Sequence, residues 1–369
     1  MHTKLQSYFN ALSNPVQLEQ ILVGTILTFL VLSLLLFVSI MLYRTIKIFD
    51  LKYIASLNDT YDELFMTAAF ADAEELNAVI EKTKLANSTH LKRKRHARII
   101  TNKLLFLYNS FSGESRKNLL ELYMSSGFVD YSEKKIHSRQ WELKAQGIRE
   151  VAEMKDTRVL GTLKKISKKR NKLLKENAQL SLLKINGFAG LDFLADMDTP
   201  LSDWHQINLL ETLKEYRNTP LPDFSVWLSS GETTVVLFAI RLISYFKQID
   251  RSDKLFPLLD HADEKVRTET IRTLGVLHIT DSIRHLVKMY DNQPLALKTE
   301  IIKAYAQLAE QKNAAIILQW LSQSSDPEIQ RNCLEALITL DATDDLKNLQ
   351  TEDSKLKEVA NSLINSNTK

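Results

Sequence analysis

The pattern that most restricts how this chain can fold is an apolar spacing that recurs at a nearly constant interval in its C-terminal half. In the stretch 263–275, an aspartate suited to capping a helix precedes Val266, Ile271 and Leu274. At 100° per residue these side chains share one broad helical face. A period of roughly 20–50 residues with two helix-sized apolar runs predicts a helical solenoid. The equivalent triplets are Val235, Ile240 and Ile243; Leu297, Ile302 and Tyr305; and Ile329, Leu334 and Leu337.

The composition favours an all-α fold. Only 9 of the 369 residues are glycine and 7 are proline, and few stretches alternate apolar and polar residues. These facts argue for helices throughout. The single cysteine, Cys333, cannot form an internal disulfide, and it lies within the apolar face of a repeat helix, so we expect it to be a buried apolar residue.

Residues 21–43 form an uncharged stretch rich in Leu, Ile, Val and Phe. A helix of this length crosses a hydrocarbon layer of ~30 Å. A buried core helix and a cleaved signal peptide are the alternatives, but the run is apolar on all sides and no small-residue cleavage site follows it. We therefore expect a transmembrane helix.

Flanking charge predicts the orientation of this span. Arg44, Lys47 and Lys52 follow it closely, and Lys4 is the only Lys or Arg before it. The positive-inside tendency then puts the N-terminus outside and the C-terminal part in the cytoplasm.

Charge is distributed unevenly along the rest of the chain. Residues 44–175 carry a net charge of +11, and residues 176–369 carry −8. Within the basic part, a dense cluster allows three interpretations: a solvated helix face, contact with anionic lipid headgroups, or nucleic-acid binding. No aromatic residues suited to base stacking interleave with the cluster, and a membrane span makes nucleic acid harder to justify, so we expect none to be bound. The expected lipid-contact residues are Lys92, Arg93, Lys94, Arg95 and Arg98.

Helix-start and turn signals divide the chain further. Asn58 or Asp59 is suited to capping a helix in residues 50–88, and Asp72 to capping the next. The predicted parts are an N-terminal segment (1–20), the transmembrane helix (21–43), a basic juxtamembrane helical region (44–170), the repeat solenoid (171–350) and a polar tail (351–369).

No catalytic or metal-binding motif stands out. Phosphate-binding glycine loops, H-E-x-x-H and cysteine clusters are all missing from the sequence. His278 and His285 could align on one helix, but residues 279–282 between them are expected to form a turn. We therefore expect neither a cofactor nor enzyme activity, although an active site assembled from distant helices would leave no such motif.

Asp263, Val266, Arg267, Ile271, Leu274 and Gly275 together resemble the HEAT repeat family. The unit beginning at Asp326 is similar but lacks the arginine directly after Ile329, and the unit at Pro294 lacks the capping aspartate. The resemblance implies a right-handed stack of antiparallel helix pairs, with a concave surface lined by the second helices. It also implies a scaffold or adaptor role, because such repeats identify architecture better than activity.

The layout of an N-terminal anchor followed by a HEAT-like array resembles accessory proteins of bacterial membrane assemblies, such as glycosyltransferase systems. We expect a scaffold that holds an unidentified protein partner at the cytoplasmic face of a membrane. The alternatives are an enzyme on such a solenoid, of the nucleic-acid glycosylase or lyase type, and a structural subunit packed permanently against transmembrane proteins. Partner-binding residues expected on the second helices are Lys254, Phe256, Arg284, His285, Lys288, Gln319 and Trp320, although Trp320 also fits a core position.

Overall fold

The computed structural model describes residues 15–310 and 313–342, and all regular structure in these ranges is α-helix or 3-10 helix. The predicted all-α fold is therefore confirmed. The predicted polar tail and the segment 1–14 lie outside the described ranges. The chain divides into two compact units, Met1–Ser132 and Glu133–Lys369, each of which we describe by itself.

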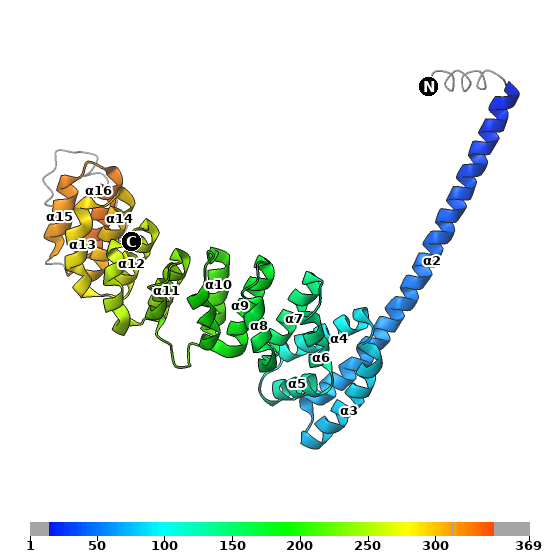
Figure 1. The fold of residues 1–369 in the computed structure, drawn as a ribbon. Coiled ribbons are helices and arrows are strands. Elements are labelled where there is room, and N and C mark those ends of the chain that lie inside the picture. Colours follow the sequence, from blue (N-terminus) through cyan, green and yellow to red (C-terminus); the bar gives the residue numbers. More distant parts are fainter. Residues whose placement is uncertain (1–14, 311–312, 343–369) are drawn as a thin grey trace. The chain divides into compact units, whose positions relative to one another are not determined.

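The first unit is dominated by α2 (Pro15–Phe70), an unbroken helix of 56 residues (Figure 1). A helix start at Asn58 or Asp59 was predicted, and this prediction is wrong. Residues 44–70 contain no glycine or proline, and Leu57, Tyr61 and Phe65 repeat at the spacing of a buried helical face. Continued burial of that face outweighs a local capping preference.

The C-terminal part of α2 packs against α3 (Ala73–His90), α4 (Lys94–Ser110) and α5 (Gly113–Ser125). Asp72 caps α3 as predicted, accepting hydrogen bonds from the amides of Glu74 and Glu75 at 3.0 and 2.9 Å. Inside this bundle, the Tyr61 hydroxyl donates to Asn87 Oδ1 at 2.7 Å, and Asn87 Nδ2 donates to the Ser126 carbonyl at 2.7 Å. These bonds satisfy buried polar groups that would otherwise destabilise the bundle.

The second unit is a stack of helical pairs arranged in two rows (Figure 1). Consecutive helices of the first row pack directly on one another: α9 on α10, α11 on α12, α12 on α14, and α14 on α16. From α9 onward their starts are almost evenly spaced along the chain, with the period seen in the sequence. The first row consists of α7 (Trp141–Glu153), α9 (Lys172–Asn186), α10 (Asp203–Lys214), α11 (Thr233–Tyr245), α12 (Glu264–Val276), α14 (Leu295–Leu308) and α16 (Pro327–Thr339).

The second row is shorter and more irregular, and several of its members are 3-10 helices. Pro257 lies in the first turn of one of them. Most of these pieces pack on the first-row helix of their own or the next pair. The boundary between the two units falls within α6 (Phe128–Ile136). The second row and its connections are η1 (Thr157–Val159), α8 (Leu160–Ile166), η2 (Gly187–Asp196), η3 (Phe224–Trp227), η4 (Ile249–Lys254), η5 (Phe256–Asp260), η6 (Thr280–Ser282), α13 (Ile283–Met289), η7 (Tyr290–Asn292) and α15 (Ala314–Gln323).

The same turn ends several first-row helices. Lys155, Lys247, His278 and Asp341 have left-handed backbone angles, with φ between 51° and 56°, and each lies two positions after the end of its helix. The next amide then bonds back to a carbonyl of the last helical turn, as in the 3.0 Å bond from Ile279 N to Leu274 O. α7 ends in this turn too, so the turn is not confined to the repeats that the sequence made clear.

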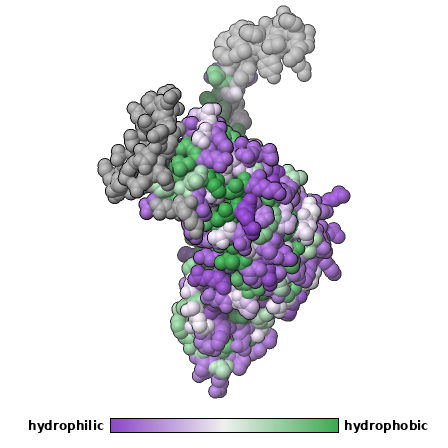
Figure 2. Space-filling view, turned by 90° about the vertical axis from the view of Figure 1, so that its left-hand side faces the viewer, coloured by the Kyte–Doolittle hydropathy of each residue, from purple (hydrophilic) through white to green (hydrophobic). Residues whose placement is uncertain are grey.

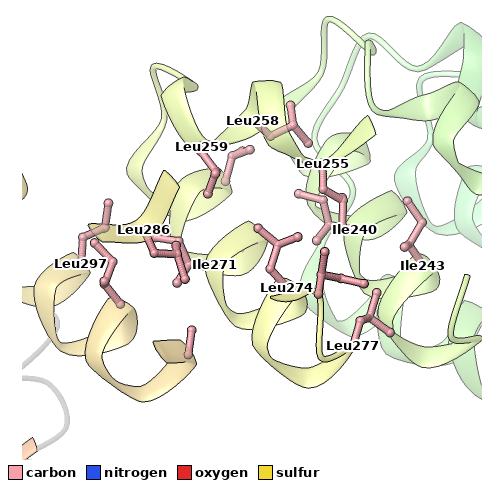
Figure 3. Close-up of a cluster of buried hydrophobic side chains, with 14 of the residues drawn as sticks. Ile240, Ile243, Leu255, Leu258, Leu259, Ile271, Leu274, Leu277, Leu286 and Leu297 are labelled. Carbon is pink, nitrogen blue, oxygen red and sulfur yellow. The ribbon is translucent and has the colours of Figure 1, made fainter. Parts of the chain in front are cut away.

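From Leu183 to Ala342, buried apolar residues from both rows form one continuous core (Figure 3), and a separate cluster from Ile136 to Leu182 precedes it in the chain. Ile240 of α11, Ile271 of α12 and Leu297 of α14 are fully buried in it, together with Leu255 and Leu286 from the second row. Each pair shares its apolar surface with its neighbours, which is how a solenoid is stabilised. Cys333 is also fully buried, as predicted, and burial raises its thiol pKa to about 12.

The capping predictions in this unit are confirmed. Asp263 accepts a hydrogen bond from the Lys265 amide at 2.7 Å, and Asp326 accepts one from the Glu328 amide at 2.8 Å. Pro327 occupies the first helical position of α16, where a missing amide costs nothing.

Candidate functional site

A wide groove of ≈ 1070 Å³ lies across the first-row helices α10, α11 and α12 of the second unit. Most of the residues that line it are polar, with charges of both signs, and the apolar ones are Pro200, Leu201 and Leu237. Such a surface suits a polar macromolecular partner better than a small apolar ligand, because ligand pockets are mostly apolar. The lining residues are Pro200, Leu201, Ser202, Asp203, Gln206, Thr233, Thr234, Leu237, Arg241, Asp263, Glu264, Lys265, Thr268, Glu269 and Arg272.

A chain of alternating charges runs across this face from α10 to α14. Arg241 lies 3.7 Å from Asp203 and 3.6 Å from Glu269, and its Nη1 donates to Gln206 Oε1 at 2.7 Å. Arg272 continues the chain, 3.4 Å from Glu269 and 3.3 Å from Glu300.

The cations of this chain recur with the helical repeat. Arg241, Arg272 and Lys303 occupy the same position in α11, α12 and α14, and Lys303 lies 3.7 Å from Glu300. Their side chains remain 38 to 53% exposed, so each has surface left for a partner. Half-exposed pairs of this kind contribute little stability, about 0–1 kcal/mol each.

Two exposed apolar side chains of α10 lie beside the groove. Trp204 is 71% exposed and Ile207 is 53% exposed. On α10 they occupy the positions that Thr234 and Leu237 occupy on α11, and both of those line the groove. By their positions in the first-row helices, Trp204 and Arg241 share one face, and exposed tryptophan and arginine are the residue types that dominate the energy of protein interfaces.

The partner-binding residues predicted from sequence lie on the second row, away from the lining of this groove. Lys254 is in η4, Arg284, His285 and Lys288 are in α13, and Gln319 is in α15. None of these five side chains is buried. Their role in binding stays a prediction.

The aromatic residues of that prediction have different surroundings. Phe256 of η5 is half-buried and stacks on His285, with ring centroids 4.9 Å apart. Trp320 is 4% exposed and stacks on Tyr290 at 4.2 Å, so it occupies the core position that the sequence also allowed. It has little surface to offer a partner.

The basic cluster is held beside α2 within the first unit. Arg95 forms an ion pair with Asp50, and the His96 ring lies 4.8 Å from the Tyr53 ring. Burial, together with the nearby Arg93 guanidinium, lowers the pKa of His96. Asp50 follows the last residue of the uncharged stretch by seven positions, about 10 Å along a helix.

The other residues of the basic cluster are exposed, close to the part of α2 that contains Asp50. Lys92, Arg93, Lys94 and Arg98 lie at the surface, and no ion pair joins them to any described residue. Arg44, Lys47 and Lys52 lie on the adjoining turns of α2. The fold thus gathers basic side chains from two distant stretches near one end of the apolar segment.

The apolar segment itself has the character that the sequence predicted. α2 is the one helix in the described part of the chain that is long and apolar enough to cross a membrane. The most apolar part of this helix buries none of its side chains within the protein. The Thr25 and Thr28 hydroxyls donate to helix carbonyls at 2.8 and 2.5 Å, which satisfies them without water.

Within the described ranges, no three His, Cys, Asp or Glu side chains are grouped as metal ligands would be. The turn predicted between His278 and His285 is confirmed, because η6 separates α12 from α13. His278 instead contacts the Gln307 carbonyl at 3.1 Å, and so helps to join α12 to α14.

Sequence reasoning missed the groove and Trp204 because it assigned the inner surface to the second helices. An alignment of the first-row helices, position by position, would have singled out Trp204. Aligning the first-row helices puts Leu173, Trp204, Thr234 and Lys265 at one position, where two apolar residues stand out against polar ones.

Comparisons with known proteins find no matching family model and no significantly similar curated sequence. Among solved structures, the chain is similar to an engineered protein, with 17% identity, TM-score 0.30, and coverage of 58% of this chain and 96% of the other. It is also similar to YibA from Escherichia coli, with 16% identity, TM-score 0.38, and coverage of 73% of this chain and 97% of the other. A third similar structure is human deoxyhypusine hydroxylase bound to glycerol, with 11% identity, TM-score 0.30, and coverage of 78% of this chain and 98% of the other. At these TM-scores the likenesses carry no information about function.

Proposed function

We propose that this chain is a single-pass membrane protein whose HEAT-like array holds a protein partner at the cytoplasmic face of a membrane, as a scaffold rather than an enzyme. The observation that carries the proposal is the continuity of α2. One unbroken helix joins an apolar segment with no buried side chains to a packed helical bundle. Such an apolar surface is costly in water and favourable in a bilayer.

Charge supports the proposed orientation. The basic residues of α2 and of the loop near Arg95 gather on the C-terminal side of the apolar segment. Each Lys or Arg near an anionic surface is worth ~1 kcal/mol, and such surfaces are characteristic of the cytoplasmic leaflet. The N-terminus would then lie outside and the array inside.

The orientation is tested with reporters at the C-terminus of the full chain in a bacterial host. A green fluorescent protein fusion should fluoresce, and an alkaline phosphatase fusion should remain inactive. An active phosphatase fusion with a dark fluorescent fusion would reverse the proposed topology.

Partner binding would use the first-row face. The groove presents polar and charged groups in register, with Trp204 and Ile207 beside it as apolar anchors. Anchoring the array also raises its effective concentration for other membrane proteins. Accessory subunits of bacterial membrane complexes, including glycosyltransferase systems, have this kind of layout.

Purification from detergent-solubilised membranes tests the partner and the face together. Trp204→Ala should reduce the yield of a specific co-purifying protein at least tenfold, as expected for a hot-spot residue worth about 2 kcal/mol. Trp141→Ala, which removes another exposed tryptophan on α7, is the matched control and should leave the yield unchanged.

The same purification also tests whether the partner-binding residues predicted from sequence contribute to binding. Combined Lys254→Ala, Arg284→Ala and Lys288→Ala changes should preserve the yield if the first-row face binds. Loss of the partner in this variant, with normal binding by Trp204→Ala, would assign the interaction to the second row.

A further inference from the structure

A second hollow, of ≈ 480 Å³, lies next to the groove and differs from it in chemistry. It is formed where α9 begins and where the chain enters α10, and it shares Pro200 and Leu201 with the groove. Its volume is within the range of small-molecule sites. No feature of the proposed scaffold function requires it.

Positive charge dominates the lining of this hollow. Lys169, Arg170, Lys172 and Lys175 line it, against a single carboxylate, Glu176. Glu176 is the only acidic side chain within 4.0 Å of any of these cations among the described residues, and it pairs with Lys172 at that limit.

The floor of the hollow is built from buried polar groups. His205 and Gln179 are buried, and His205 Nε2 lies 2.9 Å from Gln179 Oε1. Lys175 Nζ donates to Thr199 Oγ1 at 2.6 Å, which fixes this ammonium group at the edge of the hollow. Burial, and then the charges of Lys175 and Lys172, lower the pKa of His205 to about 4, so the imidazole is neutral at pH 7.

The lining also has an apolar part, which Met197 and Leu201 contribute from the segment that leads into α10, whereas the cations come from the start of α9 and the residues just before it. Cations and apolar side chains in one hollow fit a ligand that has an anionic group and an uncharged body. Lys and Arg are the usual partners of phosphate, which they bind through charge-assisted hydrogen bonds. We propose that this hollow binds an organic phosphate, with the phosphate among Lys169, Arg170, Lys172 and Lys175 and the body against Met197 and Leu201.

Such a phosphate could belong to a soluble compound or to a lipid headgroup, and the test separates the two. The full chain is placed in nanodiscs of phosphatidylcholine and titrated calorimetrically with phenyl phosphate. Saturable binding is expected, and phenol, which lacks the phosphate, should bind at least tenfold more weakly. Adding phosphatidic acid to the nanodisc should compete with phenyl phosphate if lipid is the source, and should leave its affinity unchanged if the source is soluble.

Charge changes locate the site. Arg170→Glu with Lys175→Glu should weaken phenyl phosphate binding at least tenfold, and the milder Arg170→Gln with Lys175→Gln should weaken it in the same direction with unchanged thermal unfolding. Lys165→Glu, an exposed charge change on α8 outside the lining, should alter the affinity less than twofold.

The buried histidine provides a second readout. In NMR titrations, saturating phenyl phosphate should raise the pKa of His205, because a bound anion offsets the charges of Lys172 and Lys175. The proposal is overturned if phenyl phosphate does not bind saturably, or if the Lys165 control loses as much affinity as the lining variants.

Discussion

At the scale of single residues, the array depends on a close approach between consecutive first-row helices. Gly275 of α12 faces α14, and a Cβ placed there would lie 2.6 Å from Gln307 Oε1, 3.1 Å from Ala304 Cα and 3.2 Å from Ala304 Cβ. The flexible Gln307 side chain can move, but the α14 backbone cannot do so cheaply. The small residues Gly275 and Ala304 thus set the distance between two repeats.

Gly275→Ala should therefore destabilise the protein by about 1–3 kcal/mol through overpacking. Gly161→Ala in α8 is the matched control, because its added Cβ meets no atom within 4 Å outside its own stretch of helix and alanine favours a helix by up to about 1 kcal/mol. Urea unfolding measures both changes. Equal stability of the two variants would mean that α12 and α14 are not in close contact at this point.

Other single residues of the array show which features can be predicted from sequence and which cannot. The apolar triplets and the caps at Asp263 and Asp326 depend on local spacing, and their predictions are confirmed. The chain Asp203–Arg241–Glu269 depends on which helices become neighbours across the stack, and no local pattern contains that information. Trp204 was overlooked for the same reason, because its exposure is decided by tertiary packing.

At the scale of elements, α2 shows how tertiary packing overrides local propensity. Polar residues near Asn58 favour a helix start, yet burial of Tyr61 and Phe65 against neighbouring helices keeps the helix continuous. The start of α4, with the loop that precedes it, is then held beside α2 by the ion pair between Arg95 and Asp50. Local sequence predicts the charges of this loop, but only the folded bundle brings them near the end of the apolar segment.

This arrangement predicts an effect on membrane binding. In a fragment beginning at residue 44, changing Lys92, Arg93 and Lys94 to Glu should lower partitioning onto vesicles containing phosphatidylserine at least ~100-fold, since each lost cation removes ~1 kcal/mol. Arg95 is left unchanged because it is paired with Asp50. Flotation with the vesicles measures the bound fraction.

The control for that experiment carries the same change in net charge elsewhere. Lys82, Lys84 and Lys117 are on α3 and α5, and their replacement by Glu should reduce partitioning much less. A similar loss in both variants would mean that net charge, rather than the loop beside α2, governs attachment.

At the scale of the whole molecule, the second unit is a regular array for which the sequence alone supplied most of the description. Its repeat register, its two-row construction and the continuous core from Leu183 onward follow from the recurring apolar spacing. Figure 2 looks toward the C-terminal end of the array, where hydrophilic side chains cover most of the visible described surface and apolar ones lie between them. The turn that α7 shares with later repeats was not evident from sequence, because a left-handed residue such as Lys155 depends on backbone geometry rather than on residue type.

The account as a whole depends on α2 holding the chain in a bilayer. The most direct measurement is alkaline carbonate extraction of membranes from cells that express the full chain, compared with the chain from residue 44 onward. The full chain should remain in the membrane pellet and the shorter chain should be released. Recovery of the full chain in the carbonate supernatant would contradict the account.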